Sequence, residues 1–235
     1  MREEAAAFLR ARRRPLELII FDCDGVLIDS EALCNRVVAD LITADGWPMT
    51  AQECEHRFVG MSFYTMQPVI EARLGRGLGT DWIDRMVTVV TDAMARDVEP
   101  VPGAREALEA VTSLGLKWRV ASNSSHTEMA AKFGRAGWGG LVAGRVHSAV
   151  DVIERGGAGK PAPDVYLAAA TAEPAPPAHC LVIEDSVPGV TAARAAGMDC
   201  LGLVPIGDGA ALRAAGAIPF RSMFDVPDLL RKALG

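Results

Sequence analysis

The stretch Leu18-Ile-Ile-Phe-Asp22-Cys-Asp24-Gly25-Val-Leu27 decides the fold, because a run of apolar residues there ends at two carboxylates. Such a run predicts a β-strand that is buried on both faces, as in a parallel sheet. Ligand sites of α/β proteins lie at the carboxyl ends of these strands, so Asp22 and Asp24 stand where chemistry is expected. Two neighbouring carboxylates resist double ionisation unless a cation or hydrogen bonds compensate. The stretch therefore points to a divalent metal ion.

Strand and helix patterns alternate along the second half of the chain. Apolar runs predict strands at 116–121, 145–149, 180–183 and 200–204, and helical spacing predicts helices at 104–114, 125–135, 164–171, 188–197 and from 226. This alternation is typical of the α/β class and predicts a Rossmann-like parallel sheet with helices on both faces. Right-handed crossovers then bring all strand carboxyl ends to one edge of the sheet.

The segment between the first strand and residue 98 has a different character, because it shows helical spacing and no convincing strand. Thr50 with Glu53, and later Ser125 with Glu128, match the capping-box pattern of a helix start. We therefore expect an N-terminal extension at 1–15, an α/β core at 16–30 and 98–235, and an inserted helical domain at 31–97. The arginine-rich extension is interpreted as solvated and partly helical rather than as a targeting or nucleic-acid-binding segment.

Composition narrows the class of protein. The 235 residues carry a net charge of −6, which gives no reason to expect nucleic-acid binding, and no apolar run is long enough to span a bilayer. The five cysteines are scattered, odd in number and without metal-ligand spacing, which indicates a reduced cytoplasmic protein. We expect a monomer or a weak homodimer, with no membrane partner.

Four further polar residues follow other predicted strands: Ser122 and Asn123 after the second, and Glu184 and Asp185 after the strand at 180–183. Lys160 follows a glycine-rich loop. Together with Asp22 and Asp24, these residues form a set that suits phosphoryl transfer, which is catalysed mostly by positioning and charge neutralisation.

Each residue of the set has an expected role. Asp22 can attack phosphorus to give an acyl-phosphate, and Asp24 can protonate the leaving group and then accept a proton from water. Mg²⁺ prefers oxygen ligands, here the carboxylates of Asp22 and Asp185, the main-chain carbonyl of Asp24, and Glu184 directly or through water. The Ser122 hydroxyl, the Asn123 amide and the Lys160 ammonium group are expected to hold the phosphoryl oxygens.

Four segments, in this order, resemble the motifs of the haloacid dehalogenase superfamily: Asp22-Cys-Asp24-Gly25-Val-Leu, Ser122, Gly159-Lys160-Pro161 and Glu184-Asp185-Ser186. Ile28-Asp29-Ser30-Glu31 and the segment after Ser186 are similar to the sugar-phosphatase and β-phosphoglucomutase branch. The resemblance implies that residues 31–97 form a small α-helical cap that closes to exclude water. It also implies a small phosphorylated metabolite as substrate.

Departures from the family pattern narrow the activity. Dehalogenases lack the second aspartate, so Asp24 argues against carbon–halogen chemistry. β-Phosphoglucomutases carry a cap histidine where Cys34 stands, and an arginine after a Gly-x-Ser where Gly60-Met-Ser62 is followed by Phe63. These losses favour a Mg²⁺-dependent phosphatase of sugar or sugar-acid phosphates. A phosphosugar mutase is the alternative, and a non-catalytic phosphate-binding protein is a third, less favoured one.

Overall fold

The computed structural model describes the whole chain except residues 59, 60, 62 and 235. The chain forms two compact units, a core unit of Met1–Ile28 with Pro100–Gly235 and a helical unit of Asp29–Glu99. The short strands β2 (Ile28–Asp29) and β3 (Glu99–Pro100) pair where the chain passes from one unit to the other. Each unit is described by itself below.

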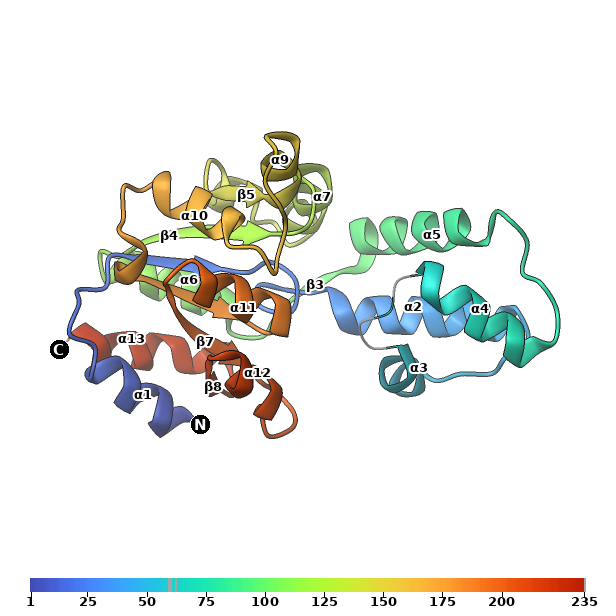
Figure 1. The fold of residues 1–235 in the computed structure, drawn as a ribbon, viewed down its shortest axis with the longest axis horizontal. Coiled ribbons are helices and arrows are strands. Elements are labelled where there is room, and N and C mark those ends of the chain that lie inside the picture. Colours follow the sequence, from blue (N-terminus) through green and yellow to red (C-terminus); the bar gives the residue numbers. More distant parts are fainter. Residues whose placement is uncertain (59–60, 62, 235) are drawn as a thin grey trace. The chain divides into compact units, whose positions relative to one another are not determined.

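A six-stranded sheet forms the centre of the core unit (Figure 1). Its order is β5-β4-β1-β6-β7-β8 and all neighbouring pairs are parallel. The bounds are β1 (Leu18–Phe21), β4 (Lys117–Ser122), β5 (Val146–Ser148), β6 (Cys180–Glu184), β7 (Asp199–Leu203) and β8 (Ile218–Phe220). The predicted α/β class with a parallel sheet is confirmed. The edge strand β8 was not predicted, because it has three residues and contains Pro219.

Helices cover both faces of the sheet (Figure 1). Leu18 and Ile20 of β1 pack in one apolar cluster with residues of α10 (Asp164–Thr171), α11 (Val187–Ala195) and α12 (Ala210–Ala215). Elsewhere α6 (Ala104–Ser113) packs on β4 and on α13 (Val226–Leu234). The core unit also contains α7 (His126–Arg135), α8 (Gly139–Val142) and α9 (Ala149–Glu154), and α9, which precedes the glycine-rich loop, was not predicted. Both faces of β1 are fully buried, as its continuous apolar run predicts.

The N-terminal segment differs from the expected solvated extension. Helix α1 (Arg2–Arg10) buries Ala5, Ala6 and Leu9 and packs on α13 and β8. Arg12 is also not solvated, since its side chain is only 6% exposed and forms an ion pair with Asp199. The segment therefore belongs to the core unit, because its few apolar residues are buried on one helical face and because Arg2 and Arg12 pair with carboxylates of that unit.

The helical unit consists of α2 (Ser30–Ala44), α3 (Ala51–Phe58), α4 (Phe63–Leu74) and α5 (Trp82–Asp97). Its apolar cluster includes Val38, Ile42, Ile70 and Trp82. The described part of residues 31–97 contains no strand. The predicted capping box is present, because Glu53 N donates to the Thr50 hydroxyl (3.2 Å) and Thr50 N donates to the Glu53 carboxylate (2.9 Å). Within the described residues, no helix is long and apolar enough to cross a membrane.

Candidate active site

The candidate site lies where the strand order reverses. Strand β1 is flanked by β4 and β6, and ligands of open α/β sheets bind at such a switch point, beyond the strand carboxyl ends. Asp22 directly follows β1, and its main-chain N–H donates to the carbonyl of Ile183 in β6 (2.9 Å). Gly25 then turns the chain with φ +75°, and a Cβ atom there would lie 1.8 Å from a carboxylate oxygen of Asp185. Glycine at this position therefore lets Asp185 approach the turn.

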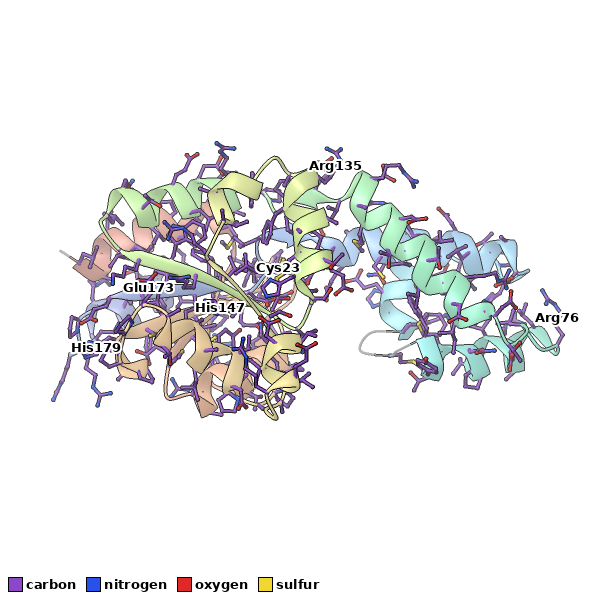
Figure 2. The ribbon with its side chains drawn as sticks, turned by 90° about the horizontal axis from the view of Figure 1, so that it is seen from above. Cys23, Arg76, Arg135, His147, Glu173 and His179 are labelled. Atoms are coloured by element: carbon purple, nitrogen blue, oxygen red, sulfur yellow. The ribbon has the colours of Figure 1, made fainter. Side chains whose placement is uncertain are left out.

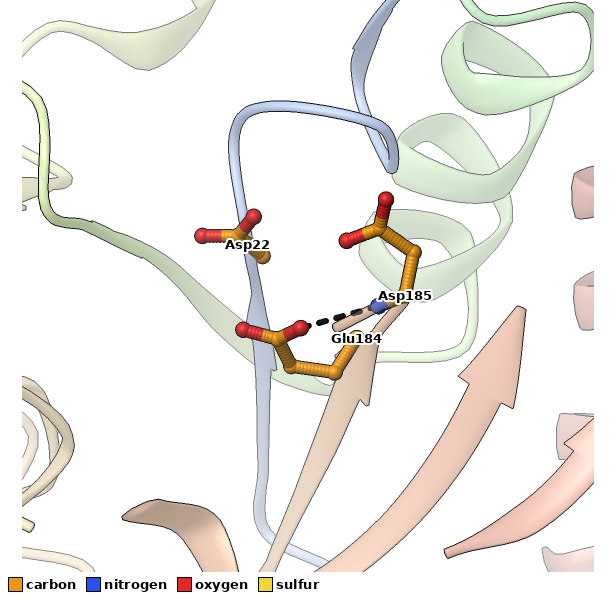
Figure 3. Close-up of side chains that lie close together, drawn as sticks. All are labelled: Asp22, Glu184 and Asp185. Atoms are coloured by element: carbon orange, nitrogen blue, oxygen red, sulfur yellow. Dashed lines mark hydrogen bonds between the residues drawn. The ribbon is translucent and has the colours of Figure 1, made fainter. Parts of the chain in front are cut away.

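Three carboxylates converge beyond the ends of β1 and β6 (Figure 3). Asp22, Glu184 and Asp185 each offer one oxygen within 4.8 Å of the others. The Lys160 ammonium group lies beside them, 2.5 Å from Asp22 Oδ1 and 2.8 Å from Glu184 Oε1. It also donates to the carbonyl of Ala121 (2.9 Å), so its three N–H donors all have partners. The structure thus brings together Asp22, Glu184, Asp185 and Lys160, as the sequence predicted.

Glu184 is fully buried and accepts hydrogen bonds at both of its oxygens. Oε1 accepts from Lys160 and from the hydroxyl of Tyr166 (2.9 Å). Oε2 accepts from the main-chain N–H groups of Asp185 (2.9 Å) and Ser186 (2.8 Å) and from the Ser186 hydroxyl (2.9 Å). A Cβ atom on Gly189 would lie only 1.6 Å from Oε1, so this carboxylate also requires a glycine in the first turn of α11. These five donors hold Glu184 rigidly beside Lys160.

The electrostatics of this cluster are uneven. Burial raises the pKa of Asp22 to about 7. Lys160 opposes this shift, whereas the negative charges of Glu184 and Asp24 add to it. Burial also tends to raise the pKa of Glu184, but Lys160 and the accepted hydrogen bonds hold it below its usual value. Burial disfavours the Lys160 ammonium, yet Asp22 and Glu184 raise the pKa of this group overall. The charged forms of Glu184 and Lys160 are therefore favoured, whereas the charged form of Asp22 is disfavoured.

This excess fits a divalent cation. The carboxylates of Asp22, Glu184 and Asp185 lie close together, and the Lys160 ammonium group pairs with the first two of them. With all three carboxylates ionised, these four groups together carry a net charge of −2, which one divalent ion would neutralise. Oxygen donors of this kind suit Mg²⁺, and a cation beside Asp22 would oppose the effect of burial on the pKa of this carboxyl group.

Asp24 has a separate environment that the sequence did not predict. Its Oδ1 accepts from the ammonium group of Lys132 (2.6 Å), and its Oδ2 accepts from the hydroxyl of Ser124 (2.9 Å). Burial lowers the pKa of Lys132, but the Asp24 carboxylate outweighs this effect and the pKa is raised overall. One signal was available in the sequence, because Lys132 lies three residues after Met129 and beside Phe133, on the buried face of α7.

Ser122 and Asn123 lie at the end of β4, beside the lysine loop. The buried Ser122 hydroxyl accepts from Ser124 N (3.0 Å). The Asn123 side chain accepts from Lys160 N (2.9 Å) and donates to Lys160 O (3.4 Å), so it anchors the loop that carries the lysine. The predicted capping box of Ser125 and Glu128 then begins α7. The contact of Ser122 and Asn123 with phosphate stays a prediction.

Cys23 lies between the two aspartates and is fully buried in the core unit (Figure 2). Burial, together with the nearby Asp24 carboxylate, raises the pKa of its thiol well above the usual value. The thiolate form that a nucleophile requires is therefore disfavoured, and Asp22 is the better candidate.

Fold and site together define an α/β enzyme whose carboxylates and lysine meet at a sheet switch point. Residues 16–197 match the haloacid dehalogenase-like hydrolase family, and the chain belongs to this family. Curated relatives include 6-phosphogluconate phosphatase of Escherichia coli (27% identical, covering 78% of this chain and 80% of the relative). The phosphorylated carbohydrates phosphatase of Thermotoga maritima is 28% identical, and the match covers 93% of this chain and 100% of the relative. The chain is thus similar to phosphoric monoester hydrolases along most of its length.

A longer relative and two solved structures complete the comparison. The chain is 32% identical to the chloroplastic protein SUPPRESSOR OF QUENCHING 1 of Arabidopsis thaliana over 84% of its length, but spans only 19% of that relative. A HAD family hydrolase of Deinococcus radiodurans with bound phosphate and sodium has a TM-score of 0.84 (31% identical, 93% and 96% covered). A putative beta-phosphoglucomutase of Thermotoga maritima has a TM-score of 0.78, is 28% identical, and covers 92% of this chain and 99% of its own length. These neighbours confirm the fold that the sequence resemblance implied.

Proposed function

We propose that this chain is a Mg²⁺-dependent phosphatase of small phosphate monoesters, of the class of sugar and sugar-acid phosphates. The observation that carries the proposal is the ion-paired, buried carboxylate of Asp22 beside Lys160, Glu184 and Asp185 at the sheet switch point. The two phosphatase relatives act, by their names, on 6-phosphogluconate and on phosphorylated carbohydrates, which supports this substrate class.

The proposed reaction has two displacements at phosphorus. An oxygen of Asp22 attacks phosphorus, the bond from phosphorus to the ester oxygen breaks, and Asp24 gives its proton to the leaving alkoxide. Water then attacks the same phosphorus, Asp24 takes the water proton, and the bond to Asp22 breaks to release inorganic phosphate. Asp22 reacts as the carboxylate, so positive charge that lowers its raised pKa also increases the reactive fraction.

The carboxylates of Asp22 and Asp185 and the carbonyl of Asp24 would hold Mg²⁺. Since the oxygens of Glu184 are already occupied by protein donors, we propose that Glu184 reaches the ion through water. Bound Mg²⁺ would supply the positive charge that the cluster lacks and would orient a phosphoryl oxygen. Lys160, Ser122 and Asn123 would hold the remaining phosphoryl oxygens, with Lys160 exchanging one of its present acceptors for the substrate.

A phosphosugar mutase is the competing hypothesis, and one solved neighbour is named as such. Two observations in the helical unit favour hydrolysis. Cys34 packs against the apolar cluster of that unit, and Phe63 packs edge-on against Trp82 with ring centroids 6.5 Å apart. Neither offers the cation that would retain a bisphosphate. Gly60 and Ser62, which belong to the same comparison, lie outside the described residues.

The test is a product assay with a panel of phosphorylated sugars and sugar acids, with Mg²⁺ and after chelation. We expect stoichiometric release of inorganic phosphate that requires the cation. Formation of glucose 6-phosphate from glucose 1-phosphate and a bisphosphate activator, without net phosphate release, would establish the mutase instead. Phosphate binding without turnover of any ester, including a generic aryl phosphate, would leave only a non-catalytic binding protein.

A further inference from the structure

Lys132 is an unusual residue on α7, because it lies on the buried side of an amphipathic helix. Its side chain is 9% exposed, and its helical neighbours Met129 and Phe133 are both buried. The ammonium group is 2.6 Å from Asp24 Oδ1 and 3.1 Å from the Ser124 hydroxyl. The lysine stem therefore crosses an apolar layer and ends at the carboxylate that the proposed reaction uses for proton transfer.

Both oxygens of Asp24 have partners in this arrangement. Oδ1 accepts from Lys132, and Oδ2 accepts from the Ser124 hydroxyl (2.9 Å). Ser124 is itself held at both main-chain groups, since its N–H donates to Ser122 Oγ (3.0 Å) and its carbonyl accepts from Ser148 Oγ (2.8 Å). Lys132 and Ser124 thus restrain the rotation of the Asp24 carboxylate, and Ser124 is itself fixed by its main-chain hydrogen bonds.

Stability alone gives little reason for a lysine at this position. A buried ion pair is a weak source of folding free energy, because desolvation of the charges offsets their attraction. An unbranched apolar residue between Met129 and Phe133 would extend the buried face of α7 without that cost. The effect of the Lys132–Asp24 pair is therefore expected mainly in the orientation of Asp24.

We propose that Lys132, assisted by Ser124, is a positioning residue that holds the Asp24 side chain in the orientation for proton transfer to the leaving group. Asp24 carries the proton when the anionic ester is bound, and after giving it to the leaving group it becomes the carboxylate that pairs with Lys132 and Ser124. This inference rests on the proposed phosphatase function. Restraint of a catalytic group within a narrow range of orientations is a large part of its efficiency. Lys132 does not contact the phosphoryl group in this proposal, and its task differs from that of Lys160.

The test compares two substrates that differ in their need for an acid. An alkyl phosphate requires protonation of its leaving group, whereas 2,4-dinitrophenyl phosphate expels a stable phenolate without it. The ratio kcat/KM reports only the steps up to loss of the leaving group, so the later role of Asp24 as a base does not enter. For Lys132→Met we expect kcat/KM on the alkyl ester to fall on the order of 100-fold and on the dinitrophenyl ester to fall less than about threefold.

Ser124→Ala is the second variant, since it removes only one hydroxyl and preserves the buried packing of Lys132. We expect a smaller loss with the same dependence on the leaving group. Lys232→Met, on the exposed side of α13, is the matched control and should leave both substrates unaffected. Equal losses on the two esters, or no loss on either, would overturn the role of Lys132. Absence of turnover by the unsubstituted protein would instead contradict the phosphatase proposal itself, and the inference with it.

Discussion

Two carboxylates separated by one residue have contrasting surroundings. Asp22 shares the Lys160 ammonium group with Glu184 and lies close to the Asp185 carboxylate, whereas the oxygens of Asp24 accept from Lys132 and from the Ser124 hydroxyl. Three carboxylates and one ammonium group therefore lie on the Asp22 side, and we call Asp22, Glu184, Asp185 and Lys160 the unbalanced side. On the other side one carboxylate pairs with one ammonium group, and we call Asp24, Lys132 and Ser124 the balanced side. The difference teaches that the two lysines are not equivalent: Lys160 lies among the carboxylates that we propose to bind a cation, whereas Lys132 forms an ion pair with Asp24.

The strongest test of this comparison removes the charge of Asp22. For Asp22→Asn we expect phosphate release to fall by at least about 10⁴-fold, as loss of a nucleophile does in other hydrolases. The fold should remain intact, since the amide keeps the shape of the side chain. Phosphate release is the measurement, circular dichroism checks the fold, and Asp40→Asn on the exposed side of α2 is the control. Turnover at more than a small fraction of the original rate would exclude Asp22 as the nucleophile.

The pH dependence of stability tests the surplus charge directly. Folding raises the pKa of Asp22 from its ordinary value of 3.8 to about 7. The folded protein therefore holds a proton that the unfolded chain has lost, and stability falls as pH rises through this window. Asp22→Asn removes the titrating group and with it this loss of stability at high pH. In the presence of a chelator, the stability of the variant relative to the unsubstituted protein should therefore rise by on the order of 3 kcal/mol between pH 4 and pH 8. This value follows from about 1.4 kcal/mol per pKa unit.

Urea denaturation at several pH values measures this difference, and the titrating groups that do not interact with Asp22 cancel in the comparison of the two proteins. Mg²⁺ at pH 8 should restore stability to the unsubstituted protein and have a smaller effect on Asp22→Asn. A stability difference that stays constant with pH would show that Asp22 is not the group that carries the excess charge.

The two sides should also differ in cation affinity. Asp185→Asn removes a carboxylate from the unbalanced cluster, and we expect Mg²⁺ binding to weaken by at least on the order of 100-fold, more than the loss of an outer-sphere partner causes. Lys132→Met changes only the balanced side and should bind Mg²⁺ with an affinity within about threefold of the original. Calorimetric titration of both proteins measures the effect. Equal weakening in the two variants would contradict the division of the site into two environments.

The sequence predicted the unbalanced side well, and the physical reason is local. Asp22, Ser122 and Glu184 each follow an apolar run, so the end of a buried strand can be located without knowledge of tertiary packing. Once the strands are parallel, their carboxyl ends must meet at one edge. The family resemblance added Lys160, which lies in a loop and has no periodic signal of its own.

The helical residues that contact the carboxylates on either side were missed, because these contacts depend on how the helices dock. Lys132 and Tyr166 lie inside α7 and α10, and neither follows a strand. Their meeting with Asp24 and Glu184 depends on the rotation of each helix on the sheet, which local pattern does not determine. A lysine or tyrosine on an otherwise apolar helical face is the signal that could have revealed them. Helix α1 was misjudged for the same reason, since its small apolar face is covered by α13 and β8, which lie far away in the sequence.

The smallest expected effect concerns Tyr166, which joins the unbalanced side from α10. Its hydroxyl donates to Glu184 Oε1, and its ring lies 4.7 Å from the Lys160 ammonium group. Tyr166→Phe removes one of five hydrogen bonds to Glu184 and keeps the ring, so we expect a loss of about 1 kcal/mol in unfolding free energy. Because Lys160 still holds the same oxygen, kcat should change less than about fivefold.

Thermal and urea unfolding measure the stability change, and Tyr64→Phe is the matched control, since Tyr64 is 75% exposed. The comparison with Lys132→Met is informative because both variants remove a buried donor to a carboxylate. Glu184 retains four donors after the change, whereas Lys132→Met removes the ammonium group that pairs with Asp24. A large fall in kcat for Tyr166→Phe would mean that Glu184 depends on each donor, and that redundancy of contacts does not separate the two sides of the site.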